Sequence, residues 1–448
     1  MPPTNRNPFA ERTNLQSWLV QPKTKRPLDD IDDAHSRKRV KLSPDYSSDG
    51  SYESDSDAET LPPRRRVRHP CAANPRLPFV STLPVLQSLV SSNKSDVFRC
   101  QSVLENSFLT PPYACSYSHS ARSGGAPLLA VATEQGTVYV INTSKRNEWD
   151  PEPVYTTLQP HNNGIFDVKW NGDDTLLATG SGDRSARVSD LQTCLPIHTL
   201  GHNSTIKCLS WDTVHRDLLT TGGRDGTISV WDLRAHEDVG SNGKRKAPKG
   251  KHASVPRTVT SLVYSDTNPH QLISSGSSDG ILRCWDLRVS KKGKSPVCLL
   301  SSPVDPYPSL VMGSGPTTGL IFGLGSDSRI HTYARDSLLV CGNSFTHERL
   351  QTNFYVKLAA SPCGRWLATG GTGHCGAFAF DVSNATRGSG VGTGVELKGY
   401  SGDVGGIDWA SNGLLSTCCD DGTVRTWRPD AAQNRAAGEE EQWNWCRA

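Results

Sequence analysis

From about residue 80 to residue 430, the chain consists of short runs in which apolar and polar side chains alternate. Turns rich in glycine and aspartate separate these runs. Alternation with a period of two residues is typical of β-strands that bury one face, and such short runs are not typical of helices. The pattern therefore predicts an all-β domain built from many short strands.

A repeated unit sets the order of these strands. Each unit has small residues, a turn residue and, six positions later, a residue that is most often aromatic. The turn residues are Gln135, Asp183, Asp225, Asp279, Asp327, His374 and Asp421, followed by Ile141, Ser189, Trp231, Trp285, Tyr333, Phe380 and Trp427. Successive turn residues lie 42 to 54 residues apart, close to the period of about 40–45 residues for four-stranded propeller blades. Seven such units predict a seven-bladed WD40 β-propeller over residues 105–430.

Closure of the ring needs a strand from outside the repeats. Trp427 ends the third strand of the last unit, and only a polar tail, residues 431–448, follows the propeller. We therefore expect the outer strand of the last blade to come from residues 94–104. Residues 79–92 predict a short amphipathic helix just before it, so that 79–104 forms one closing segment.

Polar side chains of the third unit can form a buried hydrogen-bonded chain. Asp225 can accept from His202, His202 from Thr221, and Thr221 from the indole N–H of Trp231. Such a chain satisfies groups that otherwise cost about 1–3 kcal/mol each when buried. A catalytic triad is not indicated, because the same residue types recur in the second unit and a catalytic site is not copied from blade to blade. The further members of this structural set are His161, Thr179, Asp183, Asp279, Asp421 and Trp427.

Three units depart from the repeat. The second has Ser189 in place of tryptophan, the sixth has His374 in place of the turn aspartate, and the seventh has Tyr400 in place of histidine. We expect these blades to have lost the network, to depend more on packing and to be looser.

The sequence WDLR closes the third and fourth units, at residues 231–234 and 285–288. Where these units have Arg234 and Arg288, the others have Ser144, Gln192, Asp336, Ser383 and Asp430, so the fold does not require arginine there. Two neighbouring blades would present both guanidinium groups on the face opposite the aspartate turns. Because arginine binds carboxylates and carbonyls through paired N–H groups, these residues are candidates for docking a partner.

Residues 1–75 differ from the rest of the chain: they are rich in Pro, Ser, Asp, Lys and Arg and poor in aliphatic residues. Such a segment buries too little apolar area to offset its ordering entropy, so we expect a disordered N-terminal extension. Two basic clusters in it have the spacing of a bipartite import signal, which predicts a nuclear protein. Their residues are Lys25, Arg26, Arg37, Lys38, Arg39 and Lys41.

A basic insertion, residues 235–257, separates the third and fourth units. One interpretation is a solvated loop. The alternative is a functional segment, which would be either a site of electrostatic contact with DNA or a second import signal. No aromatic residues interleave its Lys and Arg residues, so base stacking is not indicated.

Composition narrows the classes of function. A net charge of +3 argues against a protein that coats nucleic acid with its whole surface. The chain has no run of apolar residues long enough for a transmembrane helix. Its 13 Cys include no CxxC pair, so we expect reduced thiols and no metal site. We also expect no cofactor and no catalytic residues, because no phosphate-binding loop or nucleophile constellation stands out.

The WDxR endings resemble the motif by which substrate receptors dock on the DNA-damage-binding adaptor of cullin-4 RING ubiquitin ligases. Within that class, the chain resembles the denticleless family over about residues 80–430. The resemblance is most specific in the two WDLR stretches and in NFYVK at 353–357, and it extends to residues 85–90, 110–118, 128–142 and 257–265.

The resemblance implies a set of partners and residues. Trp231, Asp232, Arg234, Trp285, Asp286 and Arg288 would hold the adaptor. The opposite face would receive degrons of replication and cell-cycle proteins, some of them bound to the sliding clamp on DNA, so that contact with chromatin is indirect. A basic degron predicts acidic residues on that face. The chain itself would carry out no bond chemistry.

Two other classes of propeller remain open. One is a fizzy-type activator of the anaphase-promoting complex, and the other is a histone-binding chaperone with an acidic groove. Identification of the partners that purify with the protein would separate these classes.

Overall fold

The computed structural model describes residues 81–430, except 93–94, 104–107, 147–152, 235–257, 266–267, 269, 288–297, 302–305, 374–375 and 387–390, together with residues 446–447. The predicted N-terminal extension with its nuclear-import residues, the basic insertion and most of the C-terminal tail lie outside the described residues. Among the described residues, the strands form seven sheets.

Four sheets correspond to the first four repeats. Blade one contains β3 (Pro112–Tyr117), β4 (Leu128–Thr133), β5 (Val138–Asn142) and β6 (Tyr155–Leu158). Blade two contains β7 (Ile165–Trp170), β8 (Leu176–Ser181), β9 (Ser185–Asp190) and β10 (Leu195–Gly201). The described part of blade three contains β11 (Ile206–Trp211), β12 (Leu218–Gly223) and β13 (Ile228–Asp232). Blade four contains β14 (Val259–Tyr264), β15 (Gln271–Gly276), β16 (Ile281–Asp286) and β17 (Cys298–Ser301).

The other three sheets include strands from elsewhere in the chain. Blade five contains β18 (Ser309–Met312), β19 (Leu320–Leu324), β20 (Ile330–Ala334), β21 (Ser344–Thr346) and β25 (Val391–Thr393). Blade six contains β22 (Leu358–Ala360), β23 (Trp366–Thr369), β24 (Ala377–Asp381), β26 (Val395–Leu397) and β30 (Cys446–Arg447). Blade seven contains β27 (Val404–Trp409), β28 (Leu415–Cys419) and β29 (Thr423–Pro429), with β1 (Leu89–Val90) and β2 (Val97–Arg99). The helical elements are α2 (Leu83–Gln87), α3 (His119–Arg122) and two 3-10 turns, η1 (Gly315–Thr317) and η2 (Ser411–Gly413).

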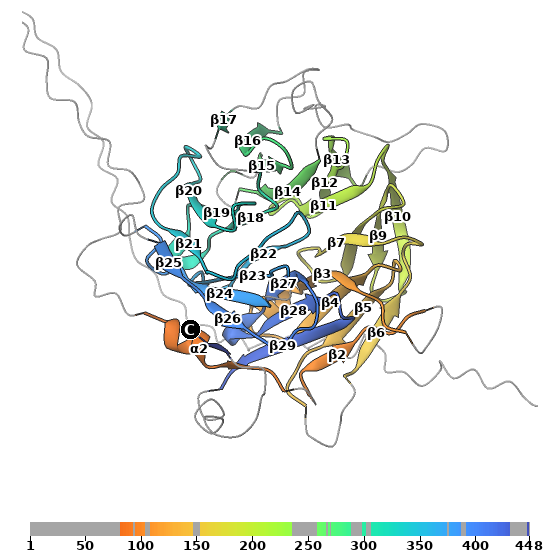
Figure 1. The fold of residues 1–448 in the computed structure, drawn as a ribbon. Helices are drawn as coiled ribbons and strands as arrows, with labels where there is room; N and C mark the ends of the chain where they lie inside the picture. The colour runs from red at the N-terminus through yellow and green to blue at the C-terminus, as the bar shows by residue number, and fades with distance from the viewer. Residues whose placement is uncertain are drawn as a thin grey trace, which may run out of the picture.

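The seven sheets form a closed ring, with their first strands nearest the centre (Figure 1). The first strand of each blade contacts the first strand of the next, and β27 of blade seven contacts β3 of blade one. This cycle of contacts confirms the seven-bladed β-propeller that the repeat predicts.

The hydrophobic core lies between neighbouring sheets. One cluster joins Ala130 and Val140 of blade one to Val168 and Trp170 of blade two, and all four side chains are buried. Similar clusters join other neighbouring blades. Because each blade buries apolar area on both faces, an isolated blade would expose the area that its neighbours cover.

The ring is closed by two short strands that precede the first repeat. β1 and β2 both pair antiparallel with β29, with Leu89 opposite Pro429 and Val97 opposite Arg425. β2 lies within the segment, 94–104, from which we expected the closing strand. The expected helix over 79–92 is shorter in the structure: α2 ends at Gln87, because Leu89 and Val90 extend along the free edge of β29.

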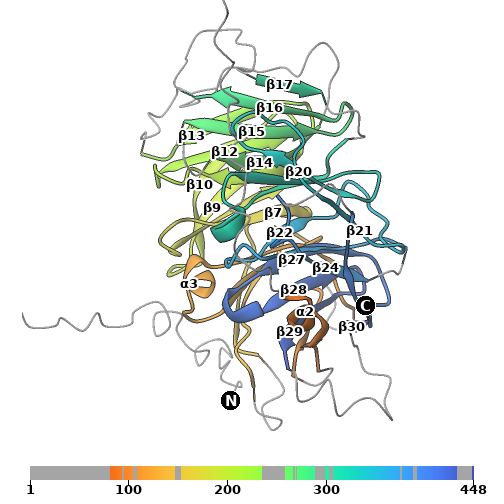
Figure 2. The ribbon, with the colours of Figure 1, turned by 90° about the vertical axis from the view of Figure 1, so that its left-hand side faces the viewer.

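Side chains of this segment fix it to blades six and seven, and α2 contacts β24 and β30 of blade six (Figure 2). Leu86 and Leu89 are each only 1% exposed, and they pack in the cluster that contains Trp409 and Trp427. The indole N–H of Trp366 in blade six donates to Thr82 Oγ1 at 2.8 Å. The closing segment is therefore part of the core as well as of the sheet.

The hydrogen-bonded chain expected within the blades is present in the second repeat, and its part from His202 to Trp231 is present in the third. His161 Nδ1 lies 2.8 Å from Asp183 Oδ2, and His161 Nε2 lies 2.9 Å from Thr179 Oγ1. In blade three, Thr221 Oγ1 lies 2.7 Å from His202 Nε2 and accepts from Trp231 Nε1 at 2.9 Å, while Asp225 accepts from Thr227. Burial lowers the pKa of His161, which favours the neutral ring of a structural histidine.

Substitutions change the network in blades four and two. In blade four, Asp279 pairs with the buried Arg283, and Trp285 Nε1 donates to Ser274 Oγ at 2.9 Å. In blade two, the Ser189 hydroxyl is buried and has no hydrogen-bond partner among the described residues, so the chain there ends at Thr179.

The expectation that blade seven has lost the network is wrong. Tyr400 Oη lies 2.7 Å from Thr417 Oγ1 and accepts from Trp427 Nε1 at 2.8 Å. Asp421 accepts from Ser401 at 2.9 Å. A phenol hydroxyl can donate and accept, and burial raises the pKa of Tyr400 so that it stays protonated. Tyrosine therefore replaces histidine in this chain of hydrogen bonds.

Removal of the closing segment should destabilise the propeller. We expect a variant that begins at residue 100 to unfold at a lower temperature than one that begins at residue 81. It loses two fully buried leucines, about 2 kcal/mol each, and exposes the edge of β29. Thermal unfolding followed by circular dichroism measures both midpoints, and equal midpoints would contradict this role of the segment.

Removal of the Tyr400 hydroxyl should also destabilise blade seven. Tyr400→Phe leaves Thr417 and the indole N–H of Trp427 with weaker partners, so we expect a loss of about 1–3 kcal/mol in the free energy of unfolding. Denaturant titration measures this loss. Tyr355→Phe, the same chemical change at an exposed tyrosine, should leave the free energy unchanged, and equal values for the two variants would argue against the network.

Candidate docking surfaces

The first WDLR stretch covers the last two residues of β13 in blade three and the two residues that follow the strand. Trp231 is 7% exposed and packs in the core next to blade two, with its indole N–H bound to Thr221. Asp232 and Arg234 follow at the surface, and 66% of the Arg234 side chain is exposed. The buried tryptophan therefore fixes the backbone from which the charged residues project.

Arg234 is held in one orientation by Asp232. Its Nε donates to Asp232 Oδ1 at 3.0 Å and its Nη2 donates to Asp232 Oδ2 at 2.9 Å. Asp217 Oδ2 lies 3.8 Å from Nε. These hydrogen bonds raise the pKa of the guanidinium above its usual range. Arg234 is therefore a positioned cation whose other N–H groups remain available, because Asp232 engages only one edge of the guanidinium.

The second WDLR stretch is described only in part. Trp285 is the second-last residue of β16, with 6% of its surface exposed, and its indole N–H donates to Ser274. Asp286 follows at the end of the strand, and Arg288 lies outside the described residues.

Both tryptophans of the docking prediction are buried. Trp231 and Trp285 belong to the core between blades, and each indole N–H donates within its own blade. Their contact with a partner stays a prediction. The candidate docking surface in the described residues is the group formed by Asp217, Asp232 and Arg234, which we call the Arg234 surface.

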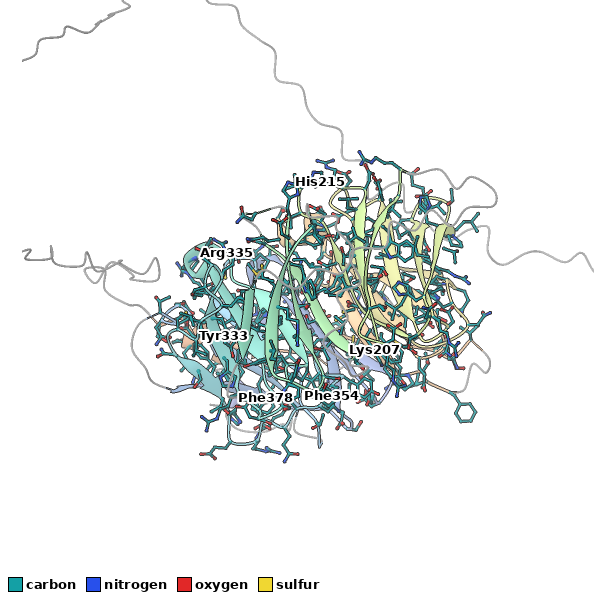
Figure 3. All side chains as sticks on the ribbon, turned by 90° about the horizontal axis from the view of Figure 1, so that it is seen from above. Lys207, His215, Tyr333, Arg335, Phe354 and Phe378 are labelled. Carbon is teal, nitrogen blue, oxygen red and sulfur yellow. The ribbon has the colours of Figure 1, made fainter. Side chains whose placement is uncertain are left out.

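The Arg234 surface lies on the same side of the ring as the loop that joins β11 to β12, which supplies Asp217, His215 and the exposed Val214. Figure 3 shows the ring from its edge, with His215 at one face and with Lys207 and Phe354 at the opposite face. The Arg234 surface and the side chains of Lys207 and Phe354 therefore lie on opposite faces of the ring.

The opposite face has a cavity at the mouth of the central channel that the sequence analysis did not assign. It has a volume of about 650 Å³, and we call it the Lys207 mouth. Its lining includes Tyr113, Phe166, Lys207, Arg224, Phe354, Tyr355, Lys357, Asp403 and Asp420. The signal for this site was the NFYVK stretch, which lines the cavity from Asn353 to Lys357.

We expected acidic residues on this face, and the lining of the Lys207 mouth contains both acidic and basic residues. Asp403 and Asp420 lie at the Lys207 mouth, but so do Lys207, Arg224 and Lys357. The expectation of an acidic face came from the family resemblance alone, because the sequence does not show which residues of different loops line one cavity.

Other classes of site do not emerge from the described residues. Within them, no three His, Cys, Asp or Glu side chains are grouped so that they could hold a metal ion. No helix in the described part is long and apolar enough to cross a membrane.

Comparisons with known families and structures agree with this fold. Residues 124–214 match the family described as anaphase-promoting complex subunit 4 WD40 domain, and residues 250–286 and 393–428 match WD domain, G-beta repeat. A chain from the crystal structure of a mitotic checkpoint complex superposes with a TM-score of 0.57 over 75% of this chain and 96% of that chain, at 21% identity. The fold and the matched repeats define a WD-repeat β-propeller protein.

Curated relatives narrow the class further. The chain is 31% identical over 339 residues to cell division cycle protein cdt2 of Schizosaccharomyces pombe, a match that covers 67% of this chain and 66% of the relative. It is 29% identical over 350 residues to the denticleless protein homolog of Danio rerio, covering 71% and 52%, and 28% identical over 353 residues to that of Homo sapiens, covering 71% and 46%. The chain belongs to the denticleless family of WD-repeat proteins. It spans about half the length of these animal relatives.

Proposed function

We propose that this chain is the substrate-recognition subunit of a cullin-4 RING ubiquitin ligase and that it docks on the DNA-damage-binding adaptor through its WDxR endings. Membership of the denticleless family supports the class of function. The observation that carries the proposal is the positioned, exposed Arg234 at a blade exit where the fold does not require arginine.

The geometry of Arg234 suits a docking residue. A guanidinium that is already fixed loses less conformational entropy when it binds, so more of its interaction energy contributes to affinity. Arginine is also enriched among residues that dominate interface energetics. Arg288 occupies the same place in the adjacent repeat, and a pair of such residues would give the adaptor two contacts on neighbouring blades.

In this role the chain is a non-catalytic receptor that needs no cofactor. It would hold the lysines of a degron-bearing substrate near the charged ubiquitin carrier and thereby raise their effective concentration. Replication and cell-cycle proteins, some of them bound to the sliding clamp, would be the substrates. The basic clusters from Lys25 to Lys41 would direct the chain to the nucleus, where it would meet chromatin indirectly.

The docking proposal is tested by charge reversal. We expect Arg234→Glu with Arg288→Glu to weaken binding to the purified adaptor at least tenfold, because each change removes a fork of N–H donors and introduces repulsion. Asp232→Ala should weaken binding less, because it frees Arg234 without removing it. Biolayer interferometry with the immobilised adaptor measures these affinities.

The matched control is Arg216→Glu. Arg216 is an exposed arginine in the loop that also supplies Asp217, and it pairs with Asp173 of blade two. It lies outside the WDxR motif, so its reversal should change the affinity less than threefold. If the Arg234 and Arg288 double variant is folded and binds as tightly as the native chain, the docking proposal is wrong. Mass spectrometry of proteins that co-purify from S-phase nuclei would then discriminate between the other propeller classes.

A further inference from the structure

The Lys207 mouth has an unusual arrangement of charge and aromatic rings. Lys207 projects from β11 between two rings: its Nζ lies 3.2 Å from the centroid of Phe166 and 4.9 Å from that of Tyr355. The ring of Tyr113 stacks on Phe166 with centroids 5.8 Å apart. The ammonium group is therefore held by aromatic faces, an arrangement that attracts a cation without neutralising its charge.

Three cations meet at this cavity without carboxylate partners. Lys207, Arg224 and Lys357 all line it, and no carboxylate of the described residues pairs with any of them within 4.0 Å. Burial, with the charges of Lys357 and Arg224, lowers the pKa of Lys207 to about 8. The free protein thus bears the repulsion between these groups, which an anion bound at the same place would relieve.

Two further features define what could bind. Phe354 and Tyr355 are 49% and 59% exposed beside the cations, and exposed aromatic side chains of this kind are enriched at protein interfaces. Asp403 and Asp420 lie on the lining of the same cavity, and burial, followed by the charge of Asp403, raises the pKa of Asp420. The cavity is therefore bipolar, which favours one orientation of a charged ligand.

We infer that the Lys207 mouth binds a peptide through an anionic side chain, either a phosphorylated residue or a glutamate or aspartate. Lys207, Arg224 and Lys357 surround the anionic group, and the neighbouring apolar residues of the peptide lie across Phe354 and Tyr355. A cavity of about 650 Å³ accommodates a few side chains, in the usual range for ligand sites, so the ligand is a short extended segment.

This inference rests on the proposed function in one respect: the bound peptide is taken to be part of a substrate protein. The peptide site and the Arg234 surface lie on opposite faces, so each can be removed without the other. Charge reversal at the mouth should leave adaptor affinity unchanged, and reversal of Arg234 and Arg288 should leave peptide binding unchanged.

The test uses the full chain and three oriented libraries of 12-residue peptides with a fixed central phosphoserine, glutamate or serine. We expect the immobilised protein to retain the phosphoserine or the glutamate library at least tenfold more than the serine library. The ratio of the two anionic libraries identifies the source of the charge. Equal retention of all three libraries would overturn the inference.

Variants locate the binding to the mouth. Arg224→Glu, at an exposed turn position, should reduce retention of the preferred anionic library at least tenfold with little risk to the fold. Arg184→Glu is the matched control, because Arg184 is an exposed residue in the corresponding turn of blade two and does not line the cavity. If the two variants lose binding equally, or neither does, the site is not the Lys207 mouth.

A pH profile separates a direct role of Lys207 from a packing role. Since the pKa of Lys207 is about 8, the free ammonium loses its proton between pH 7 and pH 9, and anion binding should weaken several-fold over that range. Lys207→Arg keeps the charge and should remove this dependence. The other titratable or charged groups at the cavity are Arg224, Lys357, Tyr113, Tyr355, Asp403 and Asp420, and the pKa of Tyr113 is raised to about 12. An unchanged slope in Lys207→Arg would show that Lys207 does not bind the anion.

Discussion

The whole propeller depends on the seam where its last blade meets its first. No single element runs through the centre of the ring to hold the sheets together. Each inner strand is therefore fixed by its neighbour on either side, and closure requires that β27 contact β3. The seam is strengthened at the rim by β1 and β2, which cover the edge of β29. Because both faces are built from loops of different blades, the Arg234 surface and the Lys207 mouth keep their geometry only while the seam holds.

The repeat in the sequence predicted the fold because its signal is local. Each pair of a turn residue and an aromatic residue six positions later indicates one hairpin. Seven such hairpins bury their apolar faces by packing against one another. The blade networks of His161 and His202 followed from residue type, since the same polar chain fits each blade. Tyr400 was misread because a tyrosine can take the role of a histidine only if its hydroxyl reaches the same place, which spacing along the chain does not reveal.

The two candidate surfaces differ in how far the sequence could reveal them. Arg234 could be identified from the sequence because most of the other repeats have a different residue at its position, and such a departure can be seen by aligning the repeats. The structure added that Asp232 fixes the Arg234 side chain and that Trp231 is buried in the core between blades. The Lys207 mouth could not be derived in this way, because Phe166, Lys207 and Tyr355 come from three blades and meet only through the curvature of the ring.

Closure at the seam also bears on how the protein is made. Arg428 binds Asp96 across 332 positions of the chain, so this pair cannot form until residue 428 has left the ribosome. During synthesis Leu86 and Leu89 emerge well before their partners Trp409 and Trp427. At a translation rate of roughly 5–20 residues per second, the apolar closing segment waits for tens of seconds without its binding site. During that interval the uncovered leucines are apolar surface of the kind that promotes aggregation.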